Sequence, residues 1–341
     1  MANQNNHKNF TYAIIGSGAL GGLYGGMLAN AGFEVHFLLH RDFEHVQENG
    51  FQVESHWGDF HLPAASIADR IHASPETMPA CDVTIIGLKT TNNHLLSTLL
   101  PAPTADGGVV LVLQNGLGIE SDAAAVVNQI GNQSNEASRV LTGCCFLCSN
   151  KIAPGHIRHL DQGRIVFGDW QDCDGLQRSE ESKKTSLDRP KSISPIAKQI
   201  EADFHAAGIE AQTTDDMLLT RWRKLLWNIP FNGLSVILNA SSKELIDDED
   251  AARLARLLML EVQRGAAACG VTIPDEMIEK TLEVTRTMVP YDSSMRLDYL
   301  ANRPMEIESL FWAPVHAAAN AGCEMPMTRA LALQLGFLQR R

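Results

Sequence analysis

Residues 12–39 read YAIIGSGALGGLYGGMLANAGFEVHFLL, and this stretch decides the fold. A short apolar run ends at Gly16, a glycine-rich helix should follow and end at Gly32, and a second apolar run begins directly afterwards. Strand, helix and strand in this order predict a βαβ unit with a right-handed crossover. Later apolar runs are typical of further strands in the same domain, namely residues 81–89, 108–116, 140–147 and 163–170.

The turn in this stretch has the spacing G-x-G-x-x-G, with Gly16, Gly18 and Gly21 in the glycine positions. The first glycine permits a tight turn, the second lets the backbone approach a pyrophosphate, and the third lets the helix pack on the strand. Free amides and the dipole at a helix N-terminus favour the phosphates. The motif follows a strand and opens a helix, so it predicts a dinucleotide site rather than only a close-packed glycine helix. The residues expected to contact the cofactor are Gly16, Ser17, Gly18, Ala19, Leu20 and Gly21.

The cofactor preference depends on His40, Arg41 and Asp42, which follow the second strand. An acid there would bind the ribose 2′-hydroxyl of NAD, whereas an arginine would accommodate the 2′-phosphate of NADP. Because the basic residues come first, we expect NADP (as NADPH), with Arg41 near the 2′-phosphate. Asp42 argues for the other cofactor, and Arg41 as an ordinary solvated turn residue is the alternative.

The chain changes character near residue 214. Residues 171–192 carry mixed charges and almost no apolar side chains, so we expect a surface insertion there. After residue 214 the pattern is helical almost to the end. The sequence therefore predicts an α/β fold with an N-terminal Rossmann dinucleotide-binding domain, residues 1–214, and a C-terminal all-helical domain, residues 215–341. The helical domain is expected to bind substrate and to form a possible homodimer.

The composition argues against several classes of protein. Lys and Arg total 28 against 40 Asp and Glu, a net charge of −12, which speaks against a nucleic-acid or anionic membrane partner. The first ten residues, MANQNNHKNF, lack the apolar segment of a secretory signal, and no run of 18 apolar residues could span a membrane. Seven cysteines without regular spacing fit reduced thiols better than a disulfide framework. We therefore expect a cytoplasmic protein.

A cluster of cysteines and histidines needs a separate interpretation. Cys144, Cys145 and Cys148 precede His156 and His159, and a C-x-x-C followed by H-x-x-H is compatible with zinc. The alternative is a buried strand in which cysteine acts as a small hydrophobic residue. The intervening KIAPG is typical of a hairpin turn and no second C-x-x-C follows, so we favour the strand and expect no metal.

A second informative stretch is RWRKLLWNIPFNGLSVILN, residues 221–239. It is apolar enough to be a buried helix, yet Lys224, Asn228 and Asn232 recur at intervals of four. At 100° per residue these positions drift by only about 40° per step and form one narrow stripe. Buried amides and a buried ammonium need partners, so the stripe is either a polar network between helices or the wall of a polar cleft. Pro230 should bend the helix in both cases.

Several ordered motifs together resemble the ketopantoate reductase (2-dehydropantoate 2-reductase) family. The resemblance covers residues 11 to 335 apart from the insertion. Its motifs are GSGALGG in the first turn, Leu88-Lys89, QNG ending in Asn115-Gly116, the K-x-x-x-N-x-x-x-N helix, Ser293-Ser294-Met295, and Glu306-Ile307-Glu308.

The resemblance implies NADPH-dependent reduction of a small 2-oxo acid in a cleft between a Rossmann domain and a helical domain. It implies that Lys224 is the general acid and that Glu306 binds a substrate hydroxyl and helps to position the site. Lysine suits that role because it can stabilise the developing negative charge on oxygen and also donate a proton. By the same resemblance Asn228, Asn232 and Ser294 hold the substrate. Asn115 and Lys89 would lie near the nicotinamide and its ribose, with Asn115 also near the substrate.

Two departures from the family pattern concern specificity. The family commonly has its arginine directly at the end of the second strand, where this chain has His40 before Arg41. The family also has an asparagine about ten residues after the second amide of the stripe, where this chain has Ser242. The resemblance therefore predicts ketopantoate or a closely related 2-oxo acid as the substrate, and the two departures leave the choice between them open. The alternatives are a β-hydroxyacid dehydrogenase of the same superfamily and a non-catalytic nucleotide sensor.

Overall fold

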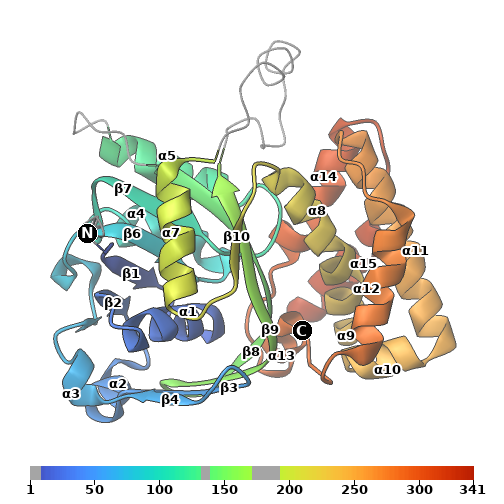
Figure 1. The fold of residues 1–341 in the computed structure, drawn as a ribbon. Coiled ribbons are helices and arrows are strands. Elements are labelled where there is room, and N and C mark those ends of the chain that lie inside the picture. The colour runs from blue at the N-terminus through green and yellow to red at the C-terminus, as the bar shows by residue number, and fades with distance from the viewer. Residues whose placement is uncertain (1–8, 132–138, 171–192) are drawn as a thin grey trace, which may run out of the picture.

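The computed structural model describes residues 9–131, 139–170 and 193–341. The N-terminal part is built on a ten-stranded sheet. Figure 1 shows this sheet beside the helices of the C-terminal part. The predicted α/β class, with a sheet followed by a helical region, is confirmed. The expected surface insertion at residues 171–192 lies outside the described residues.

The sheet contains the predicted βαβ unit. Strand β1 (Tyr12–Ile15) pairs in parallel with β2 (Val35–Leu38), and α1 (Ala19–Asn30) connects them. The strand order is β4-β3-β9-β8-β7-β6-β1-β2-β5, with β10 paired to β9. Among the strands of the described residues, only the β8–β9 and β3–β4 pairings are antiparallel. The other strands are β3 (Phe51–Ser55), β4 (Phe60–Leu62), β5 (Ile71–His72), β6 (Cys81–Ile86), β7 (Thr104–Val112), β8 (Arg139–Ala153), β9 (His156–Asp169) and β10 (Ala211–Thr213).

Helices cover both faces of the sheet, which explains why its central strands are apolar throughout. Tyr12 and Ile14 belong to the core under α1 and α7 (Pro195–Ala206), whereas Ala13 and Ile15 belong to the core under α4 (Leu96–Leu99) and α5 (Glu120–Gly131). Successive side chains of a strand point to opposite faces, so β1 serves both cores. The shorter helical segments are α2 (Phe43–Asn49), α3 (Ala64–Ile67), η1 (Pro75–Thr77) and η2 (Thr90–Leu95).

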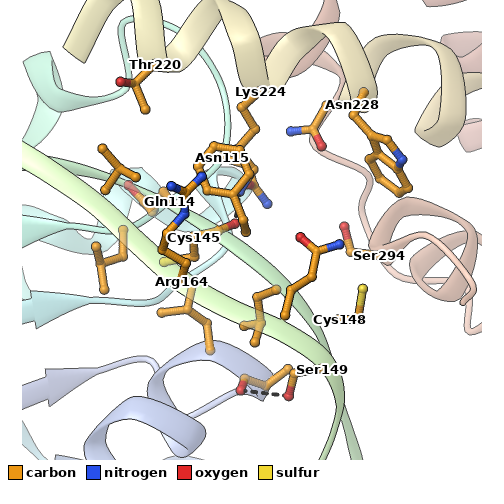
Figure 2. A pocket seen from close by; sticks show the side chains of 18 of the residues that line it. Gln114, Asn115, Cys145, Cys148, Ser149, Arg164, Thr220, Lys224, Asn228 and Ser294 are labelled. Carbon is orange, nitrogen blue, oxygen red and sulfur yellow. Dashed lines mark hydrogen bonds between the residues drawn. The ribbon is translucent and has the colours of Figure 1, made fainter. Parts of the chain in front are cut away.

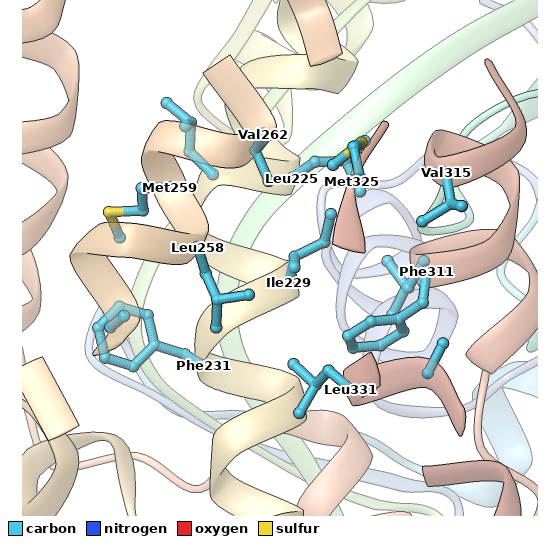
Figure 3. Packing of buried hydrophobic residues seen from close by; sticks show 14 of the residues in the cluster. Leu225, Ile229, Phe231, Leu258, Met259, Val262, Phe311, Val315, Met325 and Leu331 are labelled. Atoms are coloured by element: carbon cyan, nitrogen blue, oxygen red, sulfur yellow. The ribbon is translucent and has the colours of Figure 1, made fainter. Parts of the chain in front are cut away.

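The C-terminal helices enclose a third apolar core. In Figure 3, Leu225 and Ile229 lie between Leu258 of α11 and Phe311, all of them buried. This packing fixes the polar side of the same segment toward the sheet. The helices are α8 (Met217–Trp227), α9 (Gly233–Ile237), α10 (Ser242–Asp247), α11 (Glu249–Ala268), α12 (Asp275–Thr287), α13 (Ser294–Leu300), α14 (Ala313–Asn320) and α15 (Pro326–Gln339).

The stretch from residue 221 to 239 is not one continuous α-helix. Helix α8 ends at Trp227, the segment η4 (Asn228–Asn232) has π-helical geometry, and α9 follows. Pro230 lies in the middle of η4 and has no N–H to donate, so the α-helical ladder cannot continue through it. Single π turns of this kind occur mostly inside helices and frequently at functional sites. The expected bend at Pro230 therefore takes the form of a π turn.

Candidate active site

A cavity of about 920 Å³ lies between the carboxyl ends of the sheet strands and the C-terminal helices. In open α/β sheets, ligands generally bind at the carboxyl ends of the strands. The volume of this cavity is in the range of small-molecule sites. It brings together most of the residues predicted from the sequence: Gly16, Gly18, Ala19, Leu20, Lys89, Asn115, Lys224, Asn228, Asn232, Ser294 and Glu306. The predicted cofactor residues Ser17, Gly21 and Arg41 do not line it.

The three glycines of the first turn have the backbone geometry that the G-x-G-x-x-G spacing predicts. Gly16 has a φ of +100°, and a Cβ on Gly21 would lie 2.3 Å from the Gly16 carbonyl oxygen. A Cβ on Gly18 would meet nothing within 4 Å, because this residue faces the cavity. Helix α1 starts there without a side-chain cap and without an acidic residue in its first turn. Its amides and dipole are therefore available to an anion.

The loop after β7 packs directly against the C-terminal helices. Gly116 has a φ of +119°, and a Cβ there would lie 2.5 Å from the Cβ of Ser309. The amide of Leu117 donates to the carbonyl of Ser309 at 3.0 Å. Only glycine allows this approach, and it places Asn115 in the cavity beside Lys224 (Figure 2).

The acid that argued for NAD is engaged elsewhere. Asp42 is buried and accepts hydrogen bonds from Lys151 Nζ at 2.6 and 2.8 Å and from the Gly155 amide at 3.2 Å. Its carboxylate therefore anchors the β8–β9 hairpin to the end of β2. Arg41 is exposed on the same turn, and Ser17 Oγ donates to the Leu38 carbonyl at 3.2 Å.

Lys224 projects from the last turn of α8 into the cavity, as Figure 2 shows. Its ammonium donates a hydrogen bond to the carbonyl of Cys145 on β8 and lies 5.7 Å from the ring centroid of Phe146. Burial lowers the pKa of Lys224 below the ordinary lysine value. The side chain is therefore a better proton donor than a solvated lysine.

Glu306 connects the two parts of the molecule. Its Oε1 accepts hydrogen bonds from the Thr90 amide at 2.8 Å and from Thr90 Oγ1 at 3.0 Å. Lys89 Nζ lies 3.6 Å from Glu306 Oε2 and 2.7 Å from Asp298 Oδ2. Burial alone would lower the pKa of Lys89, but the two carboxylates outweigh it and raise the pKa. In this structure Lys89 therefore binds acids of the helical region, a contact that the sequence did not suggest.

The remaining polar residues of the predicted site lie on the π turn and at the start of α13. Asn228 and Asn232, the first and last residues of η4, are both buried and line the cavity. The Asn232 Oδ1 accepts a hydrogen bond of 3.4 Å from the Met295 amide, which ties η4 to the start of α13. Ser293 caps α13 with its side chain and presents Ser294 to the cavity. The spacing of Lys224, Asn228 and Asn232 left open whether they form a polar network between helices or line a cleft. In the structure they line the cavity, and Asn232 also bonds to a neighbouring helix.

The cysteine cluster is a buried strand, as favoured from the sequence. Cys144, Cys145 and Cys148 are buried in β8, and burial raises the pKa of Cys145 and of Cys148 to about 12. His156 pairs with Glu54, and His159 bonds to Ser55 Oγ and the Gln162 carbonyl. Across the described residues, no group of three or more His, Cys, Asp or Glu side chains is placed to hold a metal.

Two protein-family models match this chain along most of its length. The model described as ketopantoate reductase PanE/ApbA matches residues 12–172, and the one described as ketopantoate reductase PanE/ApbA C terminal matches residues 216–339. The chain belongs to the ketopantoate reductase family. Members of this family named 2-dehydropantoate 2-reductase are oxidoreductases that act on CH–OH groups, and the chain is an enzyme of that class.

Individual relatives support the same family assignment. A 2-dehydropantoate 2-reductase from Nostoc sp. is 43% identical over 330 residues, which cover 97% of this chain and 95% of that protein. The crystal structure of 2-dehydropantoate 2-reductase from Geobacter metallireducens is 36% identical, with a TM-score of 0.83 and coverage of 96% and 99%. D-mandelate dehydrogenase solved with NADH and anilino(oxo)acetate shares the fold, with a TM-score of 0.79, 20% identity and coverage of 97% and 98%.

One buried network in this ketopantoate reductase family member was not predicted. Arg221 forms an ion pair of 2.6 Å with Glu120, and its guanidinium also donates to the Gln114 carbonyl and to Thr142 Oγ1, each at 2.7 Å. Gln114 precedes Asn115, and Arg221 lies one turn before Lys224, so the network fixes these two site residues relative to each other. An arginine inside an apolar helix was the available signal, because a buried guanidinium requires a partner.

Proposed function

We propose that this enzyme reduces 2-dehydropantoate (ketopantoate), or a closely related 2-oxo acid, to the 2-hydroxy acid with NADPH. The observation that carries the proposal is the position of Lys224. Its partly buried ammonium lies in one cavity with the uncapped N-terminus of α1 and with Glu306. An anion-binding helix end and a proton donor in one cavity suit hydride transfer to a ketone.

The residues present fit a nicotinamide dinucleotide. The open space at Gly18 and the free amides of α1 would receive the pyrophosphate, and Asn115 lies where the strand ends meet the helical region. When bound, the reduced cofactor supplies a hydride for the ketone carbon. NADPH is favoured over NADH because the Asp42 carboxylate is committed to Lys151 and Gly155, while Arg41 is exposed on the same turn. NADH is the alternative cofactor to test, because D-mandelate dehydrogenase, which shares the fold, was solved with NADH.

The protein side of the mechanism follows from the pKa of Lys224. Negative charge develops on the ketone oxygen as the carbon is reduced, and the ammonium stabilises that charge and then transfers a proton to the oxygen. Burial lowers the pKa of Lys224, which makes this proton transfer easier than from an exposed lysine. Glu306, whose Oε1 is bonded to Thr90, would accept a hydrogen bond from a substrate hydroxyl. Asn228, Asn232 and Ser294 add neutral hydrogen-bonding groups that hold the substrate.

The test is oxidation of NADPH and NADH, in parallel, with a panel of 2-oxo acids, followed by absorbance. We expect turnover with ketopantoate or a close analogue and a preference for NADPH. Cofactor binding without turnover of any 2-oxo acid would refute the proposal. The panel also contains 3-hydroxy acids with the oxidised cofactors, since activity on these alone would indicate a β-hydroxyacid dehydrogenase.

Three further statements stay proposals. We propose the division into residues 1–214 and 215–341, supported by the end of β10 at Thr213 and the start of α8 at Met217. We propose a homodimer through the helical domain, supported by the exposed apolar side chains Leu333 and Phe337, four residues apart on α15; light scattering would test it.

The cytoplasmic location stays a prediction. Among the described residues, no helix is long and apolar enough to cross a membrane.

A further inference from the structure

Arg164 is a second cation in the wall of the cavity. It is a partly buried residue of β9, and Figure 2 shows its side chain among those that line the pocket with Lys224. Its Cζ lies 5.2 Å from the ring centroid of Phe146, the residue directly opposite it on β8. The Lys224 ammonium lies 5.7 Å from the same ring. Both charges are therefore held against one aromatic side chain.

The other lysines and arginines that line the cavity are either paired or exposed, and Lys280 is among the exposed ones. Lys89 is paired with Asp298, and Arg223 is exposed and reaches the Met277 sulfur at 3.5 Å. Within the described part of the chain, no carboxylate lies within ion-pair distance of Arg164, although its strand neighbour Arg158 pairs with Glu54 at 2.6 Å. A partly buried guanidinium that faces a cavity without an acid partner is suited to an anionic ligand.

We propose that Arg164 binds the carboxylate of the substrate while Lys224 faces its ketone oxygen. This inference rests on the proposed function and adds the residue that recognises the acid group. In a 2-oxo acid the carboxylate and the ketone are on adjacent carbons, so one small molecule presents both groups to two neighbouring cations. The planar guanidinium can bind a carboxylate through two parallel hydrogen bonds, and Phe146 holds it in place by stacking. Arg164 is thus a determinant of acid specificity, distinct from the proton donor.

The experiment compares the full-length enzyme with Arg164→Gln and Arg164→Lys. Each is assayed with NADPH on a 2-oxo acid and on the matching uncharged 2-oxo ester. Loss of charged hydrogen bonds should raise KM for the acid by about 10- to 100-fold in Arg164→Gln, with a smaller rise in Arg164→Lys. The kcat on the acid, KM for NADPH and kcat/KM for the ester should each stay within about threefold of the unmodified enzyme.

The matched control is Arg158→Gln, which removes an arginine from the same strand but outside the cavity. It should leave KM and kcat unchanged for both the acid and the ester. An unchanged KM for the acid in Arg164→Gln would overturn the inference. So would equal losses on acid and ester, which would mean that Arg164 supports the fold of the site. If Arg164→Gln does not fold, Arg164→Lys decides, because it keeps the charge and should lose activity selectively on the acid. The proposed function has its own test, which is turnover of 2-oxo acids by the unmodified enzyme.

Discussion

Replacing Arg221 by methionine tests whether the buried network holds the sheet and the helices together. The ion-paired side chains of Arg221 and Glu120 are only 4% and 6% exposed, and the guanidinium also serves Gln114 and Thr142. The substitution would leave the Glu120 carboxylate buried without its cation. Removing one partner of such a pair costs about 3–5 kcal/mol, a large share of the stability of an ordinary protein.

The assay is urea unfolding followed by circular dichroism and by tryptophan fluorescence, since Trp222 is fully buried next to Arg221. The double variant Arg221→Met/Glu120→Gln removes both charges, so it should be more stable than the single variant by roughly 0.5–3 kcal/mol. The control is Arg256→Gln, which breaks an exposed pair with Glu279 and should cost no more than about 1 kcal/mol. The reasoning would be refuted if Arg221→Met were as stable as this control, or if the double variant had a lower free energy of unfolding than the single variant.

Three other outcomes are expected. Lys224→Met should lower kcat by about 10²- to 10⁴-fold with little change in the dissociation constant for NADPH; equal losses in both would make the lysine structural. Burial lowers the pKa of Lys224, and the reduction needs its protonated form. The kcat should therefore fall as the pH rises through a value below the ordinary lysine pKa. A kcat that stays constant up to the ordinary lysine pKa would contradict the assignment. Gly21→Ala should lower the thermal midpoint, because its Cβ would lie 2.3 Å from the Gly16 carbonyl oxygen. Gly18→Ala, whose Cβ would meet no atom within 4 Å, should keep the midpoint but weaken NADPH binding. Calorimetry and fluorescence titration measure the two effects, and a larger loss of thermal midpoint in Gly18→Ala than in Gly21→Ala would contradict the reasoning.

Local patterns in the sequence were enough to predict the dinucleotide fold. The first βαβ unit depends on residues close together in the chain, and its glycine spacing has a direct steric meaning in Gly16 and Gly21. The β8–β9 hairpin was similarly visible as two apolar runs around a turn. Most of the candidate site followed from the family motifs, and the cavity contains eleven of the predicted residues.

Contacts between distant residues could not be predicted in this way. Asp42 was interpreted as a possible ribose ligand, but its partner Lys151 is 109 positions away. Arg221 and Glu120 are 101 positions apart, and Lys89 reaches Asp298 across 209 positions. Charged side chains have many possible partners in a sequence, and only the packed fold selects one of them. The free or engaged state of an acid, on which the proposed cofactor preference rests, is therefore a tertiary property.

Two prolines that disturb the helices help to build the site. Pro230 lies within η4, whose first and last residues are the cavity amides Asn228 and Asn232. The second π segment, η5 (Glu308–Trp312), begins just after Glu306 and is followed by Pro314. In the i→i+5 register of a π turn, the partner of the Ser309 carbonyl would be residue 314, and proline has no N–H to donate.

The free carbonyl of Ser309 is used by the sheet instead. It accepts the hydrogen bond from the Leu117 amide, two residues beyond Asn115, at 3.0 Å. A regular helix would satisfy that carbonyl internally and leave the loop without its anchor. The break in the helix therefore supplies the bond that fixes the loop of Asn115 beside Glu306 and Lys224. By this reasoning Pro314, which looks unfavourable in an apolar helix, allows the helical region to join the loop after β7 at the wall of the cavity.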